Sequence, residues 1–447
     1  MKSNVIKYIF FIAVLIIVGV AIYMIYKDNK SNSENAENQA TAQTNQTITD
    51  LRMEIVSYDT INPLISNNRN VQEITKLIFE PLLQLDENYK LQPCLATEWA
   101  KSGDTSYILK LRSNVKWQDG TSFTAQDVKY TIETLKQINS IYSYNVQHIA
   151  SVDIIDNYSI RINLDTIIPF FEYNLIFPIV SSTYFAGQDI QNTDKNATPI
   201  GTGMYKIESN STSTVVLKKN TSWWNISEKN AKVDTINVNK YSSMGEAYNA
   251  FKLGNIDILT TENINIEDNI GTIGYNKKEF YGREHDFIAL NTYDNFLSRW
   301  EVRKAISYAI DKSSIVTSVY GGKYYTADNP LDYGNWTFEQ GSSSTGYNPD
   351  QAKQVLIDGG WSYKYGSWQK VENYKTIRLS INLTVNADNS SQVAVADIIK
   401  TSLENIGIKV NVSKLNSASF QTALNNKNYG MIITGTNSSL SPSLVTY

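Results

Sequence analysis

The residue types that most often carry catalytic or metal chemistry are scarce in this chain. Its 447 residues include one cysteine, Cys94, and two histidines, His148 and His285. An intrachain disulfide and a cysteine-rich metal site are therefore excluded, and a histidine metal cage or a Ser-His-Asp triad is hard to build. The patterns GxGxxG, GxxxxGKS/T, GxSxG and HExxH do not occur. Asp153 and Asp156 could form a glycosidase pair, but a chain with 44 acidic residues offers many such pairs. We predict no catalytic residue, no metal site and no cofactor.

The densest group of titratable side chains is Arg-Glu-His-Asp at 283–286, just before a predicted strand at 287–292. A solvent-exposed start of that strand is the simpler interpretation, and recognition of a charged ligand, with Arg283 as the contact, is the alternative. Over the whole chain 40 basic and 44 acidic residues are interspersed, with a formal charge of −4. No polybasic region indicates nucleic acid as a partner.

Tyrosine is the most abundant aromatic residue, with 29 copies against 14 phenylalanines. Two clusters, at 320–336 and 363–374, could line a cleft, because tyrosine offers a flat apolar ring with a polar tip. The alternative is that tyrosine fills surface and lobes generally. A turn at 58–63 follows the first predicted strand, where ligand sites of α/β proteins tend to lie. From these regions we select four candidate ligand contacts in addition to Arg283: Tyr58, Asn62, Tyr325 and Trp336.

Short strands alternate with amphipathic helices from about Thr49 onward. Period-two alternation predicts strands at 106–112 and 159–164, and a further strand is predicted at 51–58. The segment 71–83 is expected to form a helix that ends near Pro81. A helix, a strand, a helix and a strand are predicted at 391–407, 408–415, 417–427 and 429–435. This mixed pattern is typical of α/β lobes rather than of a sandwich or a helical bundle.

Several local signals predict where helices and turns begin and end. Ser298 to Glu301 has the pattern of a capping box before an apolar helix face at 302–310, and Thr124 with Asp127 is expected to start another helix. Trp117 is expected to be packed beneath a strand and turn. In the segment PIGTG, Gly201 and Gly203 are expected to allow positive φ.

The amino-terminal region predicts a membrane attachment. Residues 9–26 are uninterrupted apolar, and at about 1.5 Å per residue they nearly span a hydrocarbon core of about 30 Å. Lysines before this run place the amino terminus in the cytoplasm. A cleaved signal peptide is the alternative, although its apolar core is usually shorter. Residues 28–48 are polar and aperiodic, which is typical of a flexible tether.

Eight segments resemble, in matching order, the family 5 extracellular solute-binding proteins, the receptors of oligopeptide, dipeptide and nickel ABC importers. They include IFEPLLQLD, VKWQDGTSFTAQDVKYTIE, PIGTGMYKI and EVRKAISYAIDKSSIV. The complete set covers 59–99, 109–133, 199–207, 217–225, 247–259, 287–292, 301–316 and 346–361.

The resemblance implies a two-lobed α/β clamshell of the periplasmic-binding-protein-like class, with an inserted subdomain, behind the transmembrane helix. The implied division is an anchor at 1–27, a linker at 28–48, a first lobe at 49–66 and 185–245, an insertion at 67–184 and a second lobe at 246–447. In peptide receptors of the family, an aspartate after a strand like YGMIITG pairs with the peptide's ammonium group. Here 434–447 contains no carboxylate, so Thr436 and Asn437 become the candidates unless an acid arrives from elsewhere.

Family members usually continue beyond the position of Tyr447 to complete the first lobe. The resemblance therefore implies either that this sequence is incomplete at its carboxyl end or that it is a shortened variant with an altered first lobe. A truncated lobe would expose sheet edges and apolar surface, so we expect poor solubility or oligomerisation of residues 49–447 made alone. The implied function is a membrane-anchored, single-pass receptor with its body on the extracytoplasmic face. It would deliver a peptide-like solute to an ABC transporter permease. A solute sensor using the same clamshell, or a receptor for a sugar or a metal complex, stays open as the alternative.

Overall fold

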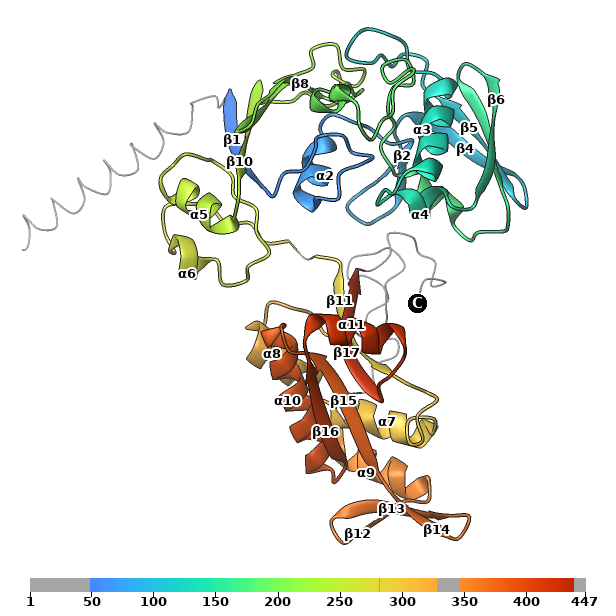
Figure 1. The fold of residues 1–447 in the computed structure, drawn as a ribbon, viewed down its shortest axis with the longest axis vertical. Coiled ribbons are helices and arrows are strands. Elements are labelled where there is room, and N and C mark those ends of the chain that lie inside the picture. Colours follow the sequence, from blue (N-terminus) through green and yellow to red (C-terminus); the bar gives the residue numbers. More distant parts are fainter. Residues whose placement is uncertain (1–48, 281, 328–345, 438–447) are drawn as a thin grey trace, which may run out of the picture.

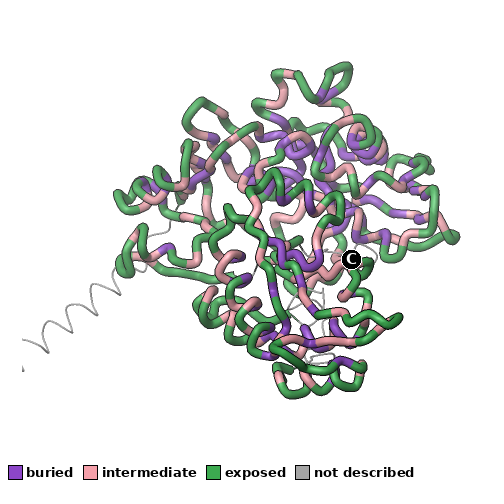
Figure 2. The backbone as a smooth tube through the Cα atoms, turned by 60° about the horizontal axis from the view of Figure 1, so that its bottom comes forward, coloured by how far each residue is buried: buried purple, intermediate pink, exposed green. Residues whose placement is uncertain are grey.

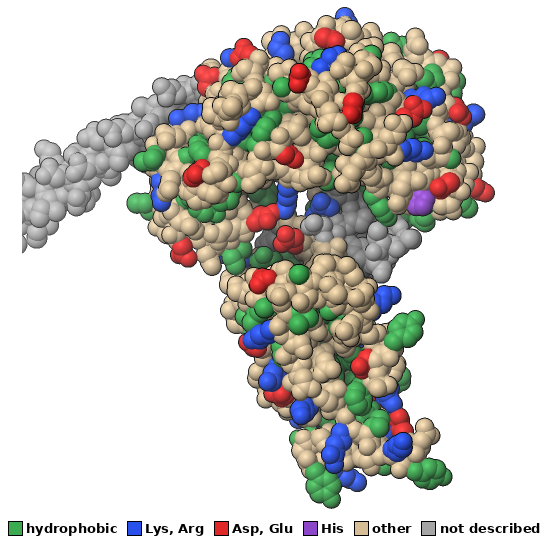
Figure 3. Space-filling model, in the orientation of Figure 1, with side chains coloured by type: hydrophobic (Ala, Val, Ile, Leu, Met, Phe, Trp, Pro, Cys, Tyr) green, Lys and Arg blue, Asp and Glu red, His purple; other side chains and the backbone are tan. Residues whose placement is uncertain are grey.

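The computed structural model of the chain describes residues 49–280, 282–327 and 346–437. These residues form two bodies that meet near strand β11, Glu284–Leu290 (Figure 1). Charged side chains of both signs are spread over the visible face of both bodies (Figure 3). The predicted apolar span at 9–26 and the tether at 28–48 lie outside the described residues. In the described ranges, no helix has both the length and the apolar character needed to cross a bilayer.

The first sheet joins strands from two distant parts of the chain. β1 (Asp50–Val56) runs parallel to β10 (Thr235–Tyr241), and β9 (Thr214–Lys219) pairs antiparallel with both β10 and β8 (Tyr205–Asn210). The resulting order is β1-β10-β9-β8. β1 lies in 49–66 and the other three strands lie in 185–245, the two segments predicted to form the first lobe. The division of the chain into lobes stays a prediction.

A second sheet of the first body is formed by the residues between β1 and β8. It is an antiparallel sheet of order β4-β5-β7-β6 that carries helix α3 against β6. One apolar core runs through both sheets, so the inserted residues pack against the first lobe rather than forming a separate core (Figure 2). The elements here are α2 (Arg69–Thr75), β2 (Leu83–Leu85), β3 (Leu91–Pro93), β4 (Ala96–Gly103), β5 (Ser106–Leu111), α3 (Ala125–Gln137), α4 (Ser143–Val146), β6 (Ile149–Asp156), β7 (Ser159–Leu164), η2 (Phe171–Leu175) and η3 (Asp194–Ala197).

The start of α3 confirms the predicted cap. Asp127 accepts the backbone N–H of Thr124 at 2.9 Å, and it also accepts the indole N–H of Trp117 at 3.2 Å. Trp117 is almost completely buried, as predicted. Helix α2, by contrast, ends at Thr75, well before the predicted end near Pro81. Residues 76–78 form a turn, and Glu80, which follows it, is buried.

Gly201 and Gly203 are needed for close packing and not for their backbone angles. Neither is among the glycines with positive φ, so the sequence-based reason was wrong. Instead, a Cβ on Gly201 would lie 1.8 Å from the carbonyl oxygen of Ile78, and one on Gly203 would lie 2.6 Å from that of Leu77. Only hydrogen fits where the two backbone segments touch.

The residues after β10 stay with the first body. Helix α5 (Met244–Lys252) packs against β1 and β10, and a short helix α6 (Glu267–Ile270) follows. Asp257 accepts from both the side chain and the backbone N–H of Arg52 on β1. These contacts favour a division between the lobes close to β11 rather than at residue 246.

The second body has its own sheet and a separate apolar core (Figure 2). Its order is β11-β17-β15-β16, where β17 (Met431–Asn437) is antiparallel to β11 and parallel to β15 (Ser380–Asn386), and β16 (Lys409–Leu415) is parallel to β15. Its described residues include the helices α7 (Trp300–Ala309), α8 (Lys312–Tyr320), α9 (Pro349–Asp358), α10 (Ser390–Asn405) and α11 (Ser417–Asn425). A small sheet of β12 (Ser362–Lys364), β13 (Ser367–Glu372) and β14 (Lys375–Arg378) extends from it.

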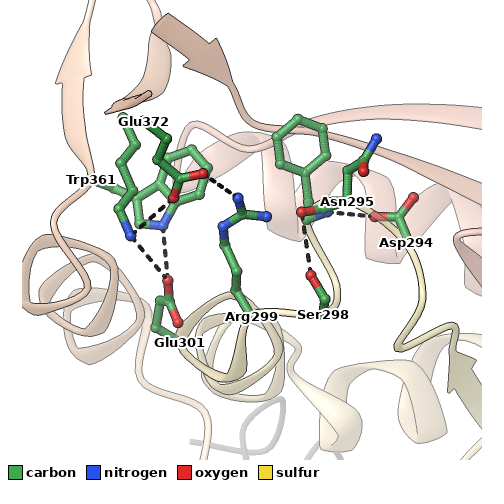
Figure 4. Close-up of polar contacts among 9 residues, drawn as sticks. Asp294, Asn295, Ser298, Arg299, Glu301, Trp361 and Glu372 are labelled. Carbon is green, nitrogen blue, oxygen red and sulfur yellow. Dashed lines mark hydrogen bonds and ion pairs between the residues drawn. The ribbon is translucent and has the colours of Figure 1, made fainter. Parts of the chain in front are cut away.

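The predicted capping box of α7 is not formed, because its acid is used elsewhere. Arg299 is the N-cap residue and makes no side-chain cap. Glu301 is buried, lies 3.8 Å from the ammonium of Lys370 and accepts the indole N–H of Trp361 at 3.4 Å (Figure 4). Arg299 in turn binds Glu372 on β13 at 2.5 Å (Figure 4). The acidic side chain therefore ties α7 to the small sheet. The predicted apolar face of α7 is buried as expected.

Candidate ligand-binding site

Strand direction places the candidate site where the two bodies meet. β15, β16 and β17 are parallel, so their carboxyl ends lie at the same end of the sheet as the start of the antiparallel β11. At that end of the sheet, β11 and β17 extend toward the first body (Figure 1). Ligands of open α/β sheets bind beyond the carboxyl ends of strands. We call this region the seam and define it as residues 56–69 and 257–264 of the first body with 283–287, 320–325 and 434–437 of the second.

One side-chain contact within the first body and one between the two bodies lie at the seam. Arg69, at the start of α2, forms an ion pair with Glu262 within the first body. Lys323, just after α8 in the second body, donates to the backbone carbonyl of Ile264 in the first. The end of α8 is thereby held against the segment that leads out of the first body.

β11 carries an acidic residue, Asp286, beside the end of β17, whereas residues 434–447 contain no acidic residue. Asp286 is paired in register with Gly435 of β17. A Cβ on Gly435 would lie 2.3 Å from Oδ1 of Asp286, so glycine makes the space that the carboxylate occupies. Asp286 thus places a carboxylate beside β17, from the neighbouring strand.

Two stacked tyrosines flank this carboxylate. The hydroxyl of Tyr320 donates to Oδ2 of Asp286 at 3.3 Å, and the rings of Tyr320 and Tyr324 lie 4.4 Å apart at 36°. Burial raises the pKa of Tyr320, and the negative charge of Asp286 raises it further. The pKa of Tyr324 is raised by burial and then by Glu284 and Asp286. Both phenols therefore stay protonated hydrogen-bond donors at neutral pH, beside a negative charge.

The turn after β1 is held mainly by contacts within the first body. Asn62 is fully buried, donates to Asn196 at 2.7 Å and accepts the backbone N–H of Leu64 at 3.0 Å. Tyr58 is half-buried, accepts from Asn210 at 2.9 Å and carries the ammonium of Lys240 over its ring at 3.7 Å. These contacts make Asn62 a structural residue of the turn and leave Tyr58 with part of its ring exposed.

Of the remaining five candidates, the four that the structure describes belong to the second body. Arg283 is half-buried just before β11, and Tyr325 is 46% exposed after α8. Thr436 and Asn437 are paired in register with His285 and Glu284. Trp336 lies outside the described residues. The structure thus gathers Arg283, Thr436 and Asn437 at one strand edge.

Asp286 and Tyr320 are two seam residues in contact with each other that the sequence analysis did not select. Both stood in clusters noted above, but their contact joins β11 to the end of α8 across 34 residues. The usable signal was strand alternation, which places Glu284 and Asp286 on the same face of β11.

A cavity of about 490 Å³ opens beside α11 in the second body. Its lining carries hydroxyl, amide and apolar groups and no charged side chain, so it suits an uncharged polar group. The lining residues are Thr384, Ser413, Leu415, Ala418, Ser419, Thr422, Ala423, Asn426 and Asn428. Thr384, Ser413 and Leu415 lie at or near the carboxyl ends of β15 and β16, as a strand-end site requires.

A smaller cavity of about 240 Å³ lies inside the first body beside Glu80. The Glu80 carboxylate accepts from the indoles of Trp223 at 3.1 Å and Trp224 at 2.8 Å and from the hydroxyl of Thr202 at 2.8 Å. Burial raises the pKa of Glu80. Because each oxygen already has a donor, this group is structural. Among the described residues, no three or more His, Cys, Asp or Glu side chains are grouped so that they could hold a metal ion.

The sequence model of the bacterial extracellular solute-binding proteins, family 5 Middle, matches residues 90–446. The glutathione-binding protein GsiB of Escherichia coli K12 is 25% identical over 375 residues, which are 81% of this chain and 68% of that protein.

Solved structures agree with this match. NikZ from Campylobacter jejuni, determined in complex with Ni(L-His), is 26% identical with a TM-score of 0.60, covering 88% of this chain and 78% of that one. HbpA2 from Haemophilus parasuis has a TM-score of 0.73 at 21% identity and covers 88% and 81% of the two chains, so it supports the fold alone.

Proposed function

This chain belongs to the bacterial extracellular solute-binding proteins of family 5, and we propose that it captures a peptide-like solute at the seam for an ABC importer. The role of this family is binding and delivery rather than catalysis. Closure of two lobes over a solute excludes water and strengthens hydrogen bonds to it, and the closed form is what a permease can recognise.

The observation that supports a peptide-like ligand is the position of Asp286 beside Gly435, near the carboxyl end of β17. An ammonium group of the solute would pair with this carboxylate and lie near the rings of Tyr320 and Tyr324, which favour a cation over their faces. The neutral cavity next to α11 would take an uncharged polar part of the same solute. Arg283, Thr436 and Asn437 would contact it along the edge.

We further propose that residues 9–26 anchor the protein in the cell membrane, with the body on the extracytoplasmic face. The apolar length of this run supports the proposal. A mass spectrum of the native protein tests it: an intact amino terminus is expected, and a mature terminus near residue 22 would contradict it.

The binding proposal is tested by titrating the full chain with a mixture of short peptides and the same peptides acetylated at the amino terminus. Free peptides should raise the melting temperature and bind more tightly than acetylated ones. Asp286→Asn should weaken binding of the free peptides by about 10- to 100-fold, the range of a lost charged hydrogen bond, and leave the acetylated ones unchanged.

Asp153→Asn on β6 is the matched control, since it removes an exposed acid far from the seam. Glutathione and a nickel–histidine complex belong in the same titration, because the glutathione-binding protein GsiB and NikZ, determined in complex with Ni(L-His), are similar to this chain. Stabilisation by the nickel complex alone, with no response to any peptide, would replace the peptide assignment by that of a metal complex.

A further inference from the structure

The small sheet of β12, β13 and β14 forms the end of the second body that lies farthest from the seam (Figure 1). It takes no part in the proposed ligand site. Its residues from Ser362 to Arg378 nevertheless have an unusual surface, in which side chains coloured as hydrophobic project at both lower corners and basic ones lie between them (Figure 3).

Each of the two turns in this sheet has a tyrosine where the backbone favours glycine or asparagine. The loop between β12 and β13 is Tyr365-Gly366, with φ values of 50° and 75°, and the loop between β13 and β14 is Asn373-Tyr374, with φ values of 48° and 61°. Two-residue hairpin loops with positive φ at both positions prefer Asn-Gly, and a bulky residue there is an outlier. Strained conformations of this kind cluster where a surface is used.

Both tyrosines are also almost completely exposed. The exposed fraction is 96% for Tyr365 and 105% for Tyr374, so neither ring gains from packing within its own body. Val371, on the strand between them, is 71% exposed. The sheet therefore presents apolar groups to the outside at positions that bring no benefit to the fold.

The charge of this sheet is opposite to that of the whole chain. Residues 362–378 contain four basic residues and one acid, Glu372, whereas the chain carries a net charge of −4. The acid is bound to Arg299 of α7. Lys364 and Arg378 pair in register with Ser367 and Gln369, on the face opposite to the buried Trp368. The outward face is thus cationic and has no acid of its own sheet.

We propose that this face docks the second body on an anionic lipid bilayer. Tyrosine rings settle at the headgroup level of membranes, and nearby Lys and Arg side chains are attracted to anionic lipids. The two loops stand at opposite ends of a six-residue strand, about 20 Å apart. Two separated, convex contact points fit a flat surface, whereas a protein partner would need a pocket for each.

The test uses the full chain, with backbone hydrogen exchange of residues 362–378 as a local readout that is separate from any binding through residues 9–26. Vesicles of phosphatidylcholine containing about one third phosphatidylglycerol should slow this exchange at about 0.1 M salt, and pure phosphatidylcholine vesicles should not. The variant Tyr365→Asn with Tyr374→Gly should lose the protection. Replacing Lys364 and Arg378 by Gln should raise the lipid concentration for half-protection about fivefold per charge.

Tyr293→Ser is the matched control, because Tyr293 is 90% exposed but lies on a different loop. It should keep the full protection. The double loop variant places preferred residues in both turns, so its melting temperature should equal or exceed that of the wild type. Unchanged exchange on anionic vesicles would overturn the proposal. So would protection without lipid that grows with protein concentration, which would indicate a second copy as the occupant.

Discussion

Glu54 on β1 is a buried acid with an incomplete hydrogen-bond set. It is 3% exposed, and its Oε1 accepts the backbone N–H of Thr260 at 2.7 Å. Its Oε2 is the one buried side-chain oxygen or nitrogen without a partner in the part of the chain that the structure describes. Burial raises the pKa of Glu54 from 4.5 to about 7, because the charged form loses its hydration.

This shift predicts a pH dependence of stability. The folded state binds the proton of Glu54 more tightly than the unfolded state does. The contribution of Glu54 to the free energy of unfolding is therefore complete below pH 4.5 and is lost as the pH rises to about 7. The free energy of unfolding should fall by about 3 kcal/mol over this window and then level off. Glu54→Gln should flatten that part of the curve, as measured by urea unfolding at several pH values.

The exposed acid Glu98, paired with Lys110 on the neighbouring strand, supplies the matched control. Glu98→Gln should leave the fall in the free energy of unfolding between pH 4.5 and 7 as it is in the wild type. An equal slope in the Glu54 variant and the wild type would show that another group controls this region.

At the scale of elements, caps and apolar faces were predictable wherever the signal stayed local. The cap at Thr124 and the apolar face of α7 appear where the sequence placed them. The cap at Ser298 failed because Glu301 is drawn into contacts with Trp361 and Lys370, residues about sixty positions away. A local pattern cannot reveal such a distant competitor.

The close approach of 199–205 to residues 77 and 78 yields a prediction for this pair of segments. Gly201→Ala should destabilise the protein by at least about 3 kcal/mol, because its Cβ would overlap the backbone of Ile78, which cannot move like a flexible side chain. Differential scanning calorimetry measures the effect.

Gly245→Ala in the first turn of α5 is the contrasting substitution. Its Cβ would meet Ser243 Oγ at 3.8 Å, an ordinary contact. It should leave stability unchanged or raise it by about 0.5–1 kcal/mol. A tolerated Gly201→Ala would mean that the two segments are not held as close as the structure places them.

At the scale of the whole molecule, two separate apolar cores predict two cooperative units. Leu109 is fully buried in the core of the first body and Leu383 in that of the second. Either Leu→Ala substitution should cost about 2–5 kcal/mol. Calorimetry should then show two transitions, with each variant lowering only its own.

A ligand that joins the lobes should bring the two transitions closer together, since it binds only when both are folded. If both variants instead lowered one shared transition by the same amount, the two bodies would fold as a single unit, which would contradict the prediction of two cooperative units.

The sequence by itself determined the α/β alternation, the order of most elements and the family, because apolar periodicity, caps and ordered motifs are local or linear features. Only the tertiary structure decided that Asn62 is a buried part of its own turn and that Asp286 meets Tyr320 beside Gly435. It also placed the neutral cavity next to α11. These arrangements depend on which strands become neighbours. Strand pairing joins residues far apart in the chain, and no single segment carries that information.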